Sequence, residues 1–413
     1  MAITPLAQSF YLGDSASLDA FDRLRVSTTT VMLDCKLTGG IAAARWLQGL
    51  TSGGTITPVN QCAADVACSA TAGSAAIFQT KQRGIYQAGR SLMALATFNF
   101  YIAGNGTANI RKRVGMFDEN DGVFLEQNGT DVRFVLRSSC TGSPVDTNAV
   151  TKANWNIDKF DGTGPSGLTL DFTKTQILFA DLEWLGVGRV RIGFVVDGII
   201  RYAHQFLNTN VLATPYMSNP NLPMRYECVQ TASANTGAMQ AICCTIISEG
   251  GFDTVGLLVG TNTGVAGRAN LGAVRDEVLA VRLGATFVRR GMLLPESVSL
   301  HQSSQPFMWE LVLNPTPTGT VVAGTWAAIA DSWAERNITR TATTGFTGGL
   351  TLTSGYVSTN TDAIILDLTT QLAVAQLDLV TPDPASDVLS LLVTTLNTTD
   401  QTYQGALSWR ELR

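Results

Sequence analysis

The stretch 155–204 constrains this chain more than any other, because its side chains alternate as they do in a β-hairpin. From Val190 to Val196 every second residue is apolar, and the residues between them include an arginine and a glycine. A period of two is typical of a strand with one buried face. Asp197-Gly198 provides a two-residue turn, and 199–202 begin the return strand. The segment therefore predicts a hairpin in an antiparallel sheet.

Strand signals recur along the rest of the chain. Short apolar and β-branched runs, separated by Asn, Gly and Asp, occupy 75–80, 91–102, 111–117, 122–126 and 131–137. No segment of ten or more residues shows a helical pattern. Similar runs continue from 279 to the end, punctuated by prolines. We therefore expect an all-β protein in which consecutive hairpins form a meander.

Changes in composition predict four parts of the chain. Residues 1–35 are polar and rich in turns, which indicates an extended arm. Residues 36–250 carry the strands of a β-sandwich, and residues 251–278 are rich in Gly, Thr and Asn, as expected of a linker. Residues 279–413 then form a second, smaller β domain.

The overall composition favours burial of apolar surface between subunits. Only 15% of the 413 residues are charged and 45% are hydrophobic, and the mean hydropathy is +0.15. Such a chain is expected to hide part of its apolar surface in a homo-oligomer. The net charge of −5 and the absence of a long basic run argue against nucleic acid and anionic membranes as partners. No apolar window is long enough to predict membrane insertion.

The sequence predicts no metal site and no cofactor. Its seven cysteines show no spacing typical of zinc ligands, and a disulfide between Cys62 and Cys68 is left open. The turn 117–122 is too short for an EF-hand loop, so a plain hairpin turn is expected. The glycines of 159–167 lack the Lys-Ser/Thr pair and the helix of a phosphate-binding loop.

Candidate catalytic residues are few. The two histidines, His204 and His301, have no nucleophile near them in sequence, and we expect His204 to bond a backbone group. Asp181 and Glu183 share one face of a predicted strand, as carboxylates do in some jelly-roll glycoside hydrolases. Position 179 lacks the third carboxylate of that pattern. We therefore predict structural roles for this pair, bonded to nearby arginines or loop amides, and no catalytic residues.

Six short segments between 21 and 227 carry a resemblance to a known family. They are FDRLRVS (21–27), WNID (155–158), GTGPSG (162–167), DFTKTQI (171–177), EWLGVGRVR (183–191) and YMSNPNLP (216–223). They resemble virion-associated structural proteins of tailed bacteriophages, especially phages of marine and environmental bacteria, with relatives in large DNA viruses. The resemblance implies a virion protein that is made in the host cytoplasm and binds other virion proteins as well as copies of itself. Capsid decoration, a fibre and a tail component all remain open.

Arms of this kind pack on the main body or on neighbouring subunits. We expect assembly contacts from five residues of the arm, Phe21, Arg23, Leu24, Arg25 and Val26.

The strand alternation around 115–118 and 185–190 resembles the concanavalin-type jelly roll, a fold that many sugar-binding modules use. Three aromatic residues are candidate contacts for a host-surface glycan, namely Trp155, Trp184 and Tyr202. The sequence thus favours a non-enzymatic virion component, with a receptor- or glycan-binding tail protein as the alternative and a glycoside hydrolase as the third possibility.

Overall fold

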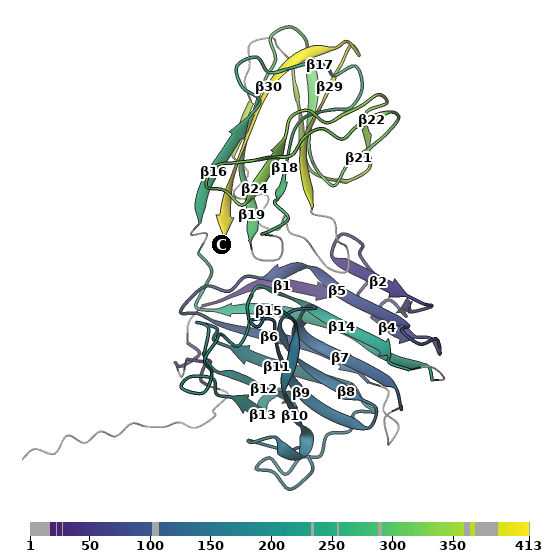
Figure 1. The fold of residues 1–413 in the computed structure, drawn as a ribbon, viewed down its shortest axis with the longest axis vertical. Helices are drawn as coiled ribbons and strands as arrows, with labels where there is room; N and C mark the ends of the chain where they lie inside the picture. The colour runs from purple at the N-terminus through teal and green to yellow at the C-terminus, as the bar shows by residue number, and fades with distance from the viewer. Residues whose placement is uncertain are drawn as a thin grey trace, which may run out of the picture. The chain divides into compact units, whose positions relative to one another are not determined.

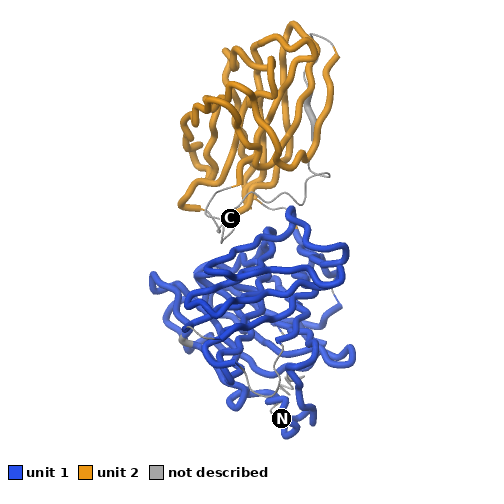
Figure 2. Tube along the Cα trace, turned by 90° about the vertical axis from the view of Figure 1, so that its right-hand side faces the viewer, with its two compact units in different colours: residues 1–252 blue, residues 253–413 orange. Residues whose placement is uncertain are grey.

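The computed structural model describes residues 17–21, 23–26, 28–100, 107–232, 235–253, 256–287, 291–358, 364–367 and 387–412. The chain divides into two compact units, residues 1–252 and 253–413 (Figure 2). Regular structure in the described ranges is almost all β-strand, and the helical element there is one 3-10 turn, Lys152–Asn154. No helix in this described part is long and apolar enough to cross a membrane. The all-β prediction is confirmed.

One layer of the first unit is an eight-stranded antiparallel sheet (Figure 1). Its order is β13 (Ile199–Phe206), β12 (Val190–Val196), β11 (Gln176–Leu182), β6 (Ser91–Asn99), β15 (Gly237–Glu249), β4 (Ala63–Cys68) and β3 (Thr55–Val59). The eighth strand, β1 (Thr29–Lys36), pairs with the second half of β15. Strand β15 therefore holds β4 and β1 end to end along one side.

The other layer is a seven-stranded sheet. Its order is β10 (Val145–Thr151), β9 (Asp131–Ser138), β8 (Gly122–Asn128), β7 (Ile110–Phe117), β14 (Leu222–Gln230), β5 (Ala75–Gly84) and β2 (Trp46–Thr51). Of the expected meander, 111–117, 122–126 and 131–137 are consecutive as β7, β8 and β9, and β10 extends them. The first two predicted strands do not belong to it, because β5 pairs with β14 and β2, and β6 lies in the other sheet. The two sheets make a jelly-roll-like sandwich, as the sequence predicted.

The core of the first unit lies between these sheets. Trp46 stacks on Phe78 with ring centroids 4.1 Å apart, and Trp155 stacks on Phe134 at 4.2 Å. Phe194 from β12 contacts both rings of the second pair. Because aromatic side chains bury large apolar areas, these clusters supply much of the stability of the sandwich.

The hairpin predicted from 190–202 is present, with one difference. Asp197 and Gly198 adopt the positive φ values, 52° and 76°, that a tight two-residue turn between twisted strands requires. The apolar side chains of β12 lie in the core as expected. Arg191, on the opposite face, is also fully buried, so the expected half-buried strand is wrong. The arm covers this outer face, as described below.

Two predicted boundaries change. Strand β1 begins at Thr29, inside the expected arm 1–35. The expected linker 251–278 contains β16 (Leu257–Asn262), β17 (Arg268–Leu271) and the start of β18 (Asp276–Leu283). Both β16 and β17 pair with the last strand of the chain. The Gly-, Thr- and Asn-rich sequence around them conceals this, because both strands are stabilised by backbone hydrogen bonds to a strand far along the chain.

The second unit is also built from two main sheets. A five-stranded sheet contains β16, β30 (Gln401–Leu412), β19 (Met292–His301) and β28 (Ile364–Asp367), with β17 paired to β30. A six-stranded sheet contains β23 (Ala327–Ala328), β24 (Ala334–Asn337), β18, β29 (Val388–Thr395), β20 (Phe307–Leu313) and β27 (Leu350–Val357). Two small pairs complete it, β21 (Thr316–Pro317) with β26 (Phe346–Thr347) and β22 (Val321–Val322) with β25 (Thr341–Ala342).

Candidate functional site

The described part of the arm folds into a compact turn, here called the arm turn (residues 17–21 and 23–26). Leu18 and Leu24 form an isolated antiparallel bridge, and the Arg25 amide donates to the Ser17 carbonyl oxygen at 2.9 Å. The Asp19 carboxylate accepts from the amides of Phe21 and Arg23, each at 2.9 Å. Asp19 thereby closes the turn as an Asx motif, in which the side chain of Asp or Asn accepts a hydrogen bond from a backbone amide a few residues later.

Arg191 of β12 and Arg189, which directly precedes that strand, hold the arm turn on the outer face of the eight-stranded sheet. Arg191 Nη2 donates to the Leu18 carbonyl oxygen at 2.8 Å, and Arg189 Nη2 donates to the Ala20 carbonyl oxygen at 2.9 Å. The side chains of Leu18 and Ala20 are buried by this docking. The arm turn is therefore part of the folded sandwich.

The Asp181 carboxylate is the centre of the docking site. Arg191 binds it in a bidentate manner, with Nε 2.9 Å from Oδ1 and Nη2 2.6 Å from Oδ2. Tyr202 donates its hydroxyl to Oδ2 at 2.7 Å, and Arg25 of the arm turn places Nη2 2.5 Å from the same oxygen. Asp181 is completely buried. A buried carboxylate needs such partners, because desolvation of an unpaired charge is costly.

Glu249 completes the cluster. Its carboxylate accepts from Arg25 Nε at 2.6 Å. Burial raises the pKa of Glu249, while Arg25 opposes this shift. Burial would lower the pKa of Arg25, but Tyr202, Asp181 and Glu249 outweigh it and the net pKa is raised. Two guanidinium groups (Arg25 and Arg191) thus face two carboxylates (Asp181 and Glu249), so the formal charge of these four groups sums to zero. We call these four residues with Tyr202 the Asp181 cluster.

The five predicted assembly residues fall into two groups. Arg25 enters the Asp181 cluster, and Arg23 pairs with Asp19 at 2.7 Å and lies over the Phe21 ring. Leu24 and Val26 are instead 57% and 85% exposed. They do not anchor the arm on its own subunit, because the bound carbonyl groups and Arg25 fix the turn with these two side chains pointing outward.

Two of the three predicted glycan contacts are in the wrong place for a surface platform. Trp155 is 3% exposed and lies in the core between Phe134 and Phe194, and Tyr202 is 4% exposed within the Asp181 cluster. Trp184 is half-buried and donates Nε1 to the Met217 carbonyl oxygen at 3.0 Å. The sequence could not predict that these aromatic side chains are buried, because the residues that pack against them come from strands far away in the chain.

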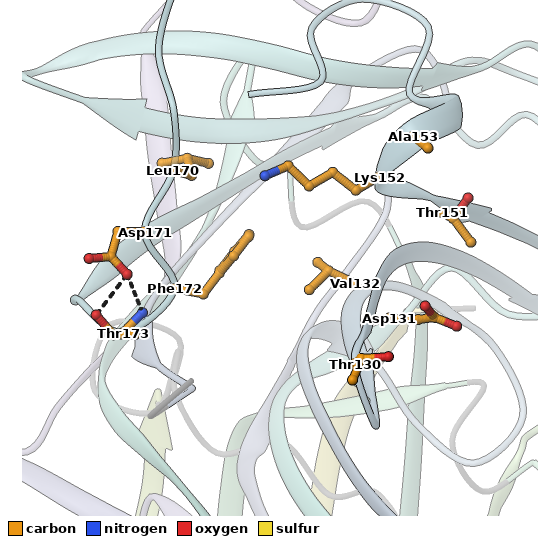
Figure 3. Close-up of a pocket in the computed structure, with 10 residues that line it drawn as sticks. All are labelled: Thr130, Asp131, Val132, Thr151, Lys152, Ala153, Leu170, Asp171, Phe172 and Thr173. Atoms are coloured by element: carbon orange, nitrogen blue, oxygen red, sulfur yellow. Dashed lines mark hydrogen bonds between the residues drawn. The ribbon is translucent and has the colours of Figure 1, made fainter. Parts of the chain in front are cut away.

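A pocket that the sequence did not indicate lies in the first unit between the β8–β9 turn, the 3-10 turn after β10 and the segment before β11 (Figure 3). It has a volume of about 500 Å³ and is lined by Thr130, Asp131, Val132, Thr151, Lys152, Ala153, Leu170, Asp171, Phe172 and Thr173. Lys152 extends from the 3-10 turn toward Leu170 and Phe172 on the opposite wall, with Nζ 5.7 Å from the Phe172 ring centroid. The lining combines hydroxyl, carboxylate and ammonium groups with one aromatic ring.

The candidate catalytic residues occupy structural positions. Glu183 accepts from the Arg189 amide at 2.9 Å, and Asp181 binds Arg191, so the predicted local partners are confirmed. His204 Nδ1 accepts from the Asn156 amide at 3.2 Å, as predicted. Burial lowers the pKa of His204 to about 4.

Cys62 and Cys68 do not form the disulfide that the sequence left open. All seven are free thiols. Cys62 is exposed and contacts the Val59 carbonyl oxygen, while Cys68 is buried against Cys228. The described residues contain no group of three or more His, Cys, Asp or Glu side chains placed to hold a metal ion.

Comparisons with known proteins find similarity only to solved structures, and at low sequence identity. No protein-family model matches the chain, and no curated protein matches it. A protein of unknown function from Shewanella oneidensis MR-1 aligns with 10% identity and a TM-score of 0.36, over 62% of this chain and 99% of that one. An endo-β-1,4-glucuronan lyase from Trichoderma reesei aligns with 10% identity and a TM-score of 0.35, over 52% and 95%. A legume lectin-like domain from Entamoeba histolytica aligns with 10% identity and a TM-score of 0.31, over 53% and 98%.

Proposed function

We propose that the protein is a non-enzymatic structural component of a tailed-phage virion, made in the host cytoplasm and assembled there in multiple copies. The observation that carries the proposal is the arm turn. The Asp181 cluster fixes its backbone while Leu24 and Val26 remain exposed. Solvent-exposed apolar side chains on a fixed turn are suited to contacts with another subunit.

The segments that resemble phage virion proteins also support a structural role, because several of them contact one another. Arg25 of the first segment binds Asp181 beside EWLGVGRVR (183–191), whose Arg191 binds the same carboxylate. Tyr216 donates its hydroxyl to the Glu183 carbonyl oxygen at 2.6 Å. These segments therefore share one hydrogen-bonded region that shapes the docking site of the arm.

Two further segments meet in a loop of the same unit. Asp158 of WNID (155–158) accepts from the Ser166 amide of GTGPSG (162–167) at 2.8 Å. A Cβ at Gly164 would lie 2.1 Å from Asp158 Oδ1, so only glycine allows this approach. The residues that carry the resemblance are thus needed for loop geometry, as in a structural protein.

Quantitative mass spectrometry of density-banded particles tests the proposal in the phage that encodes the chain. We expect the protein to band with the major capsid protein at a constant ratio corresponding to several copies per particle. A non-structural phage protein from the same lysate is the control, and it should be depleted from the band. Depletion of this chain to the same extent would overturn the proposal.

Binding of a host-surface glycan is the second candidate function. The pocket around Lys152 is a better candidate site for it than the three aromatic residues predicted from the sequence. Sugar sites in proteins combine polar groups with an apolar or aromatic wall, and this pocket has both. Calorimetric titration with host-surface polysaccharide tests this candidate, with Lys152→Ala as the pocket variant and the exposed Lys36→Ala as its control. Equal binding by both variants would exclude the pocket.

A further inference from the structure

Two cysteines from opposite sheets of the first unit lie in contact. Cys68 is the last residue of β4 in the eight-stranded sheet, and Cys228 lies in β14 of the seven-stranded sheet. Both belong to the core cluster and are 3% and 0% exposed. Their Sγ atoms are 3.3 Å apart, and 160 positions separate them in the chain.

This separation is close to that needed for a covalent bond. A disulfide has an S–S length of about 2.05 Å, so the sulfur atoms need to approach by little more than about 1 Å. Closure of the bond therefore requires the two side chains to rotate within the core. The bond would covalently join two sheets that otherwise associate through side-chain packing and through hydrogen bonds such as those from the Tyr226 hydroxyl to the Thr97 and Cys243 carbonyl oxygens.

A buried cation lies beside the pair. Lys112 of β7 is the direct cross-strand partner of Cys228, is 3% exposed, and donates Nζ to the Phe100 carbonyl oxygen. Burial lowers the pKa of Lys112, and the two thiols oppose this shift. A neighbouring positive charge favours a thiolate, which is the reactive form of cysteine.

The two thiols are also unequal. The sulfur–sulfur hydrogen bond between the two thiols lowers the pKa of Cys68 to about 7, against the effect of burial. The same hydrogen bond, with burial, raises the pKa of Cys228. Cys68 is also the less completely buried of the two, at the end of β4, so we assign the attacking thiolate to Cys68.

We propose that Cys68 and Cys228 are a redox-active pair that closes an inter-sheet disulfide by exchange with a low-molecular-weight disulfide such as oxidised glutathione. The Cys68 thiolate attacks one sulfur of glutathione disulfide, forms a mixed disulfide and releases one glutathione thiolate. Cys228 then attacks Cys68 Sγ, which releases the second glutathione thiolate, and the proton of Cys228 passes to that departing thiolate. Two protein thiols are oxidised and one glutathione disulfide is reduced to two thiols.

The chain provides an internal comparison for this pair. Cys35 and Cys244 are also partners, but they lie on the adjacent strands β1 and β15 of one sheet. A bond between them would join strands already held by backbone hydrogen bonds. The inference concerns the core alone and stands independently of the proposed virion role.

The test uses the full chain carrying Cys62→Ser, which removes the exposed thiol and leaves six of the seven cysteines. The reduced protein is incubated with oxidised glutathione, quenched in acid, unfolded and labelled with N-ethylmaleimide. We expect the number of labels to fall from six to four, and peptide mapping to find Cys68 linked to Cys228. Adding Cys68→Ser should keep the remaining thiols reduced, whereas adding Cys35→Ser should leave the cross-link unchanged.

Because both thiols are buried, the reaction is also run during refolding from urea in the same glutathione buffer, where the reagent has free access. Six labels under both conditions, or a cross-link between Cys35 and Cys244 in place of Cys68 and Cys228, would overturn the proposal. If Cys68→Ser does not fold, Cys228→Ala provides the same comparison. We also expect the oxidised protein to melt several degrees above the reduced one, since a disulfide that closes a long loop restricts the unfolded chain.

Discussion

Arg25 and Asp181, separated by 156 positions in the chain, form an ion pair of 2.5 Å beneath the arm turn. Asp181 has no exposed surface in this position. Arg25 therefore takes the place of water as a partner of the Asp181 carboxylate. Without the arm turn, this outer face of the sheet would be open to water. Arm docking and sheet formation are thus energetically linked through these two side chains.

Removal of the central carboxylate should destabilise the first unit strongly. In Asp181→Asn, the guanidinium groups of Arg25 and Arg191 lose their shared counter-ion while still buried. Breaking a buried ion pair in this way typically costs about 3–5 kcal/mol. Urea denaturation followed by tryptophan fluorescence measures the change, and Asp34→Asn, which affects an exposed pair with Lys36, is the control. A midpoint equal to that of the unsubstituted protein would contradict the role given to the cluster.

The exposed residues of the arm turn should control self-association. We expect Leu24→Asp and Val26→Asp to weaken the oligomer while leaving the melting temperature unchanged, because both side chains point away from their own subunit. Sedimentation velocity over a range of concentrations provides the measurement. Val265→Asp, at a 98% exposed position of the second unit, is the matched control. A chain that is monomeric before substitution would refute the expected oligomer.

Acidification should destabilise the fold partly through His204. Its pKa is lowered from 6.5 to about 4 in the folded state by burial, so between these pH values the unfolded state binds a proton that the folded state rejects. Stability is therefore lost as the pH falls through this window, by on the order of 3 kcal/mol for this group. His204→Asn retains an acceptor for the Asn156 amide and should flatten this part of the stability profile. Parallel pH profiles for the two proteins would speak against the prediction.

Polysaccharide cleavage is not expected. Asp181 and Glu183 bond arginine side chains and backbone amides, which occupies both carboxylates. Incubation with host-surface polysaccharide should release no reducing sugar, either from the original chain or from the Asp181→Asn, Glu183→Gln double variant. Turnover by the original chain that disappears in the variant would establish a hydrolase instead.

Gly193 of β12 should tolerate no side chain. A Cβ there would lie 2.1 Å from the Arg201 carbonyl oxygen, at the irregular pairing of β12 with β13 that places Tyr202 beside Asp181. Overpacking of this kind typically costs about 1–3 kcal/mol, and more where the backbone must move. Thermal melting of Gly193→Ala measures the loss. Gly260→Ala, where the nearest atom would be 3.4 Å away, is the control and should melt normally.

The alternation of apolar and polar residues was sufficient to predict the all-β class, the hairpin around Asp197-Gly198 and most strands of the meander. These features depend on local spacing and turn residues, which neighbouring positions encode. The bonding of Glu183 to the Arg189 amide was predictable for the same reason, since its partner lies six positions away. The structural role of His204 followed from the absence of a nearby nucleophile.

The sequence by itself determined the all-β class, the strands of the hairpin 190–202 and of the segments 111–117, 122–126 and 131–137, and the tight turn at Asp197-Gly198. Only the tertiary structure decided that β16 and β17 replace the expected linker, that Trp155 and Tyr202 are buried, and that Leu24 and Val26 point outward. It also brought Arg25 to Asp181 and Cys68 to Cys228. The physical reason is that burial and pairing depend on the free energy of contacts between residues far apart in the chain. The local alternation of apolar and polar residues does not specify which distant strand will be the neighbour.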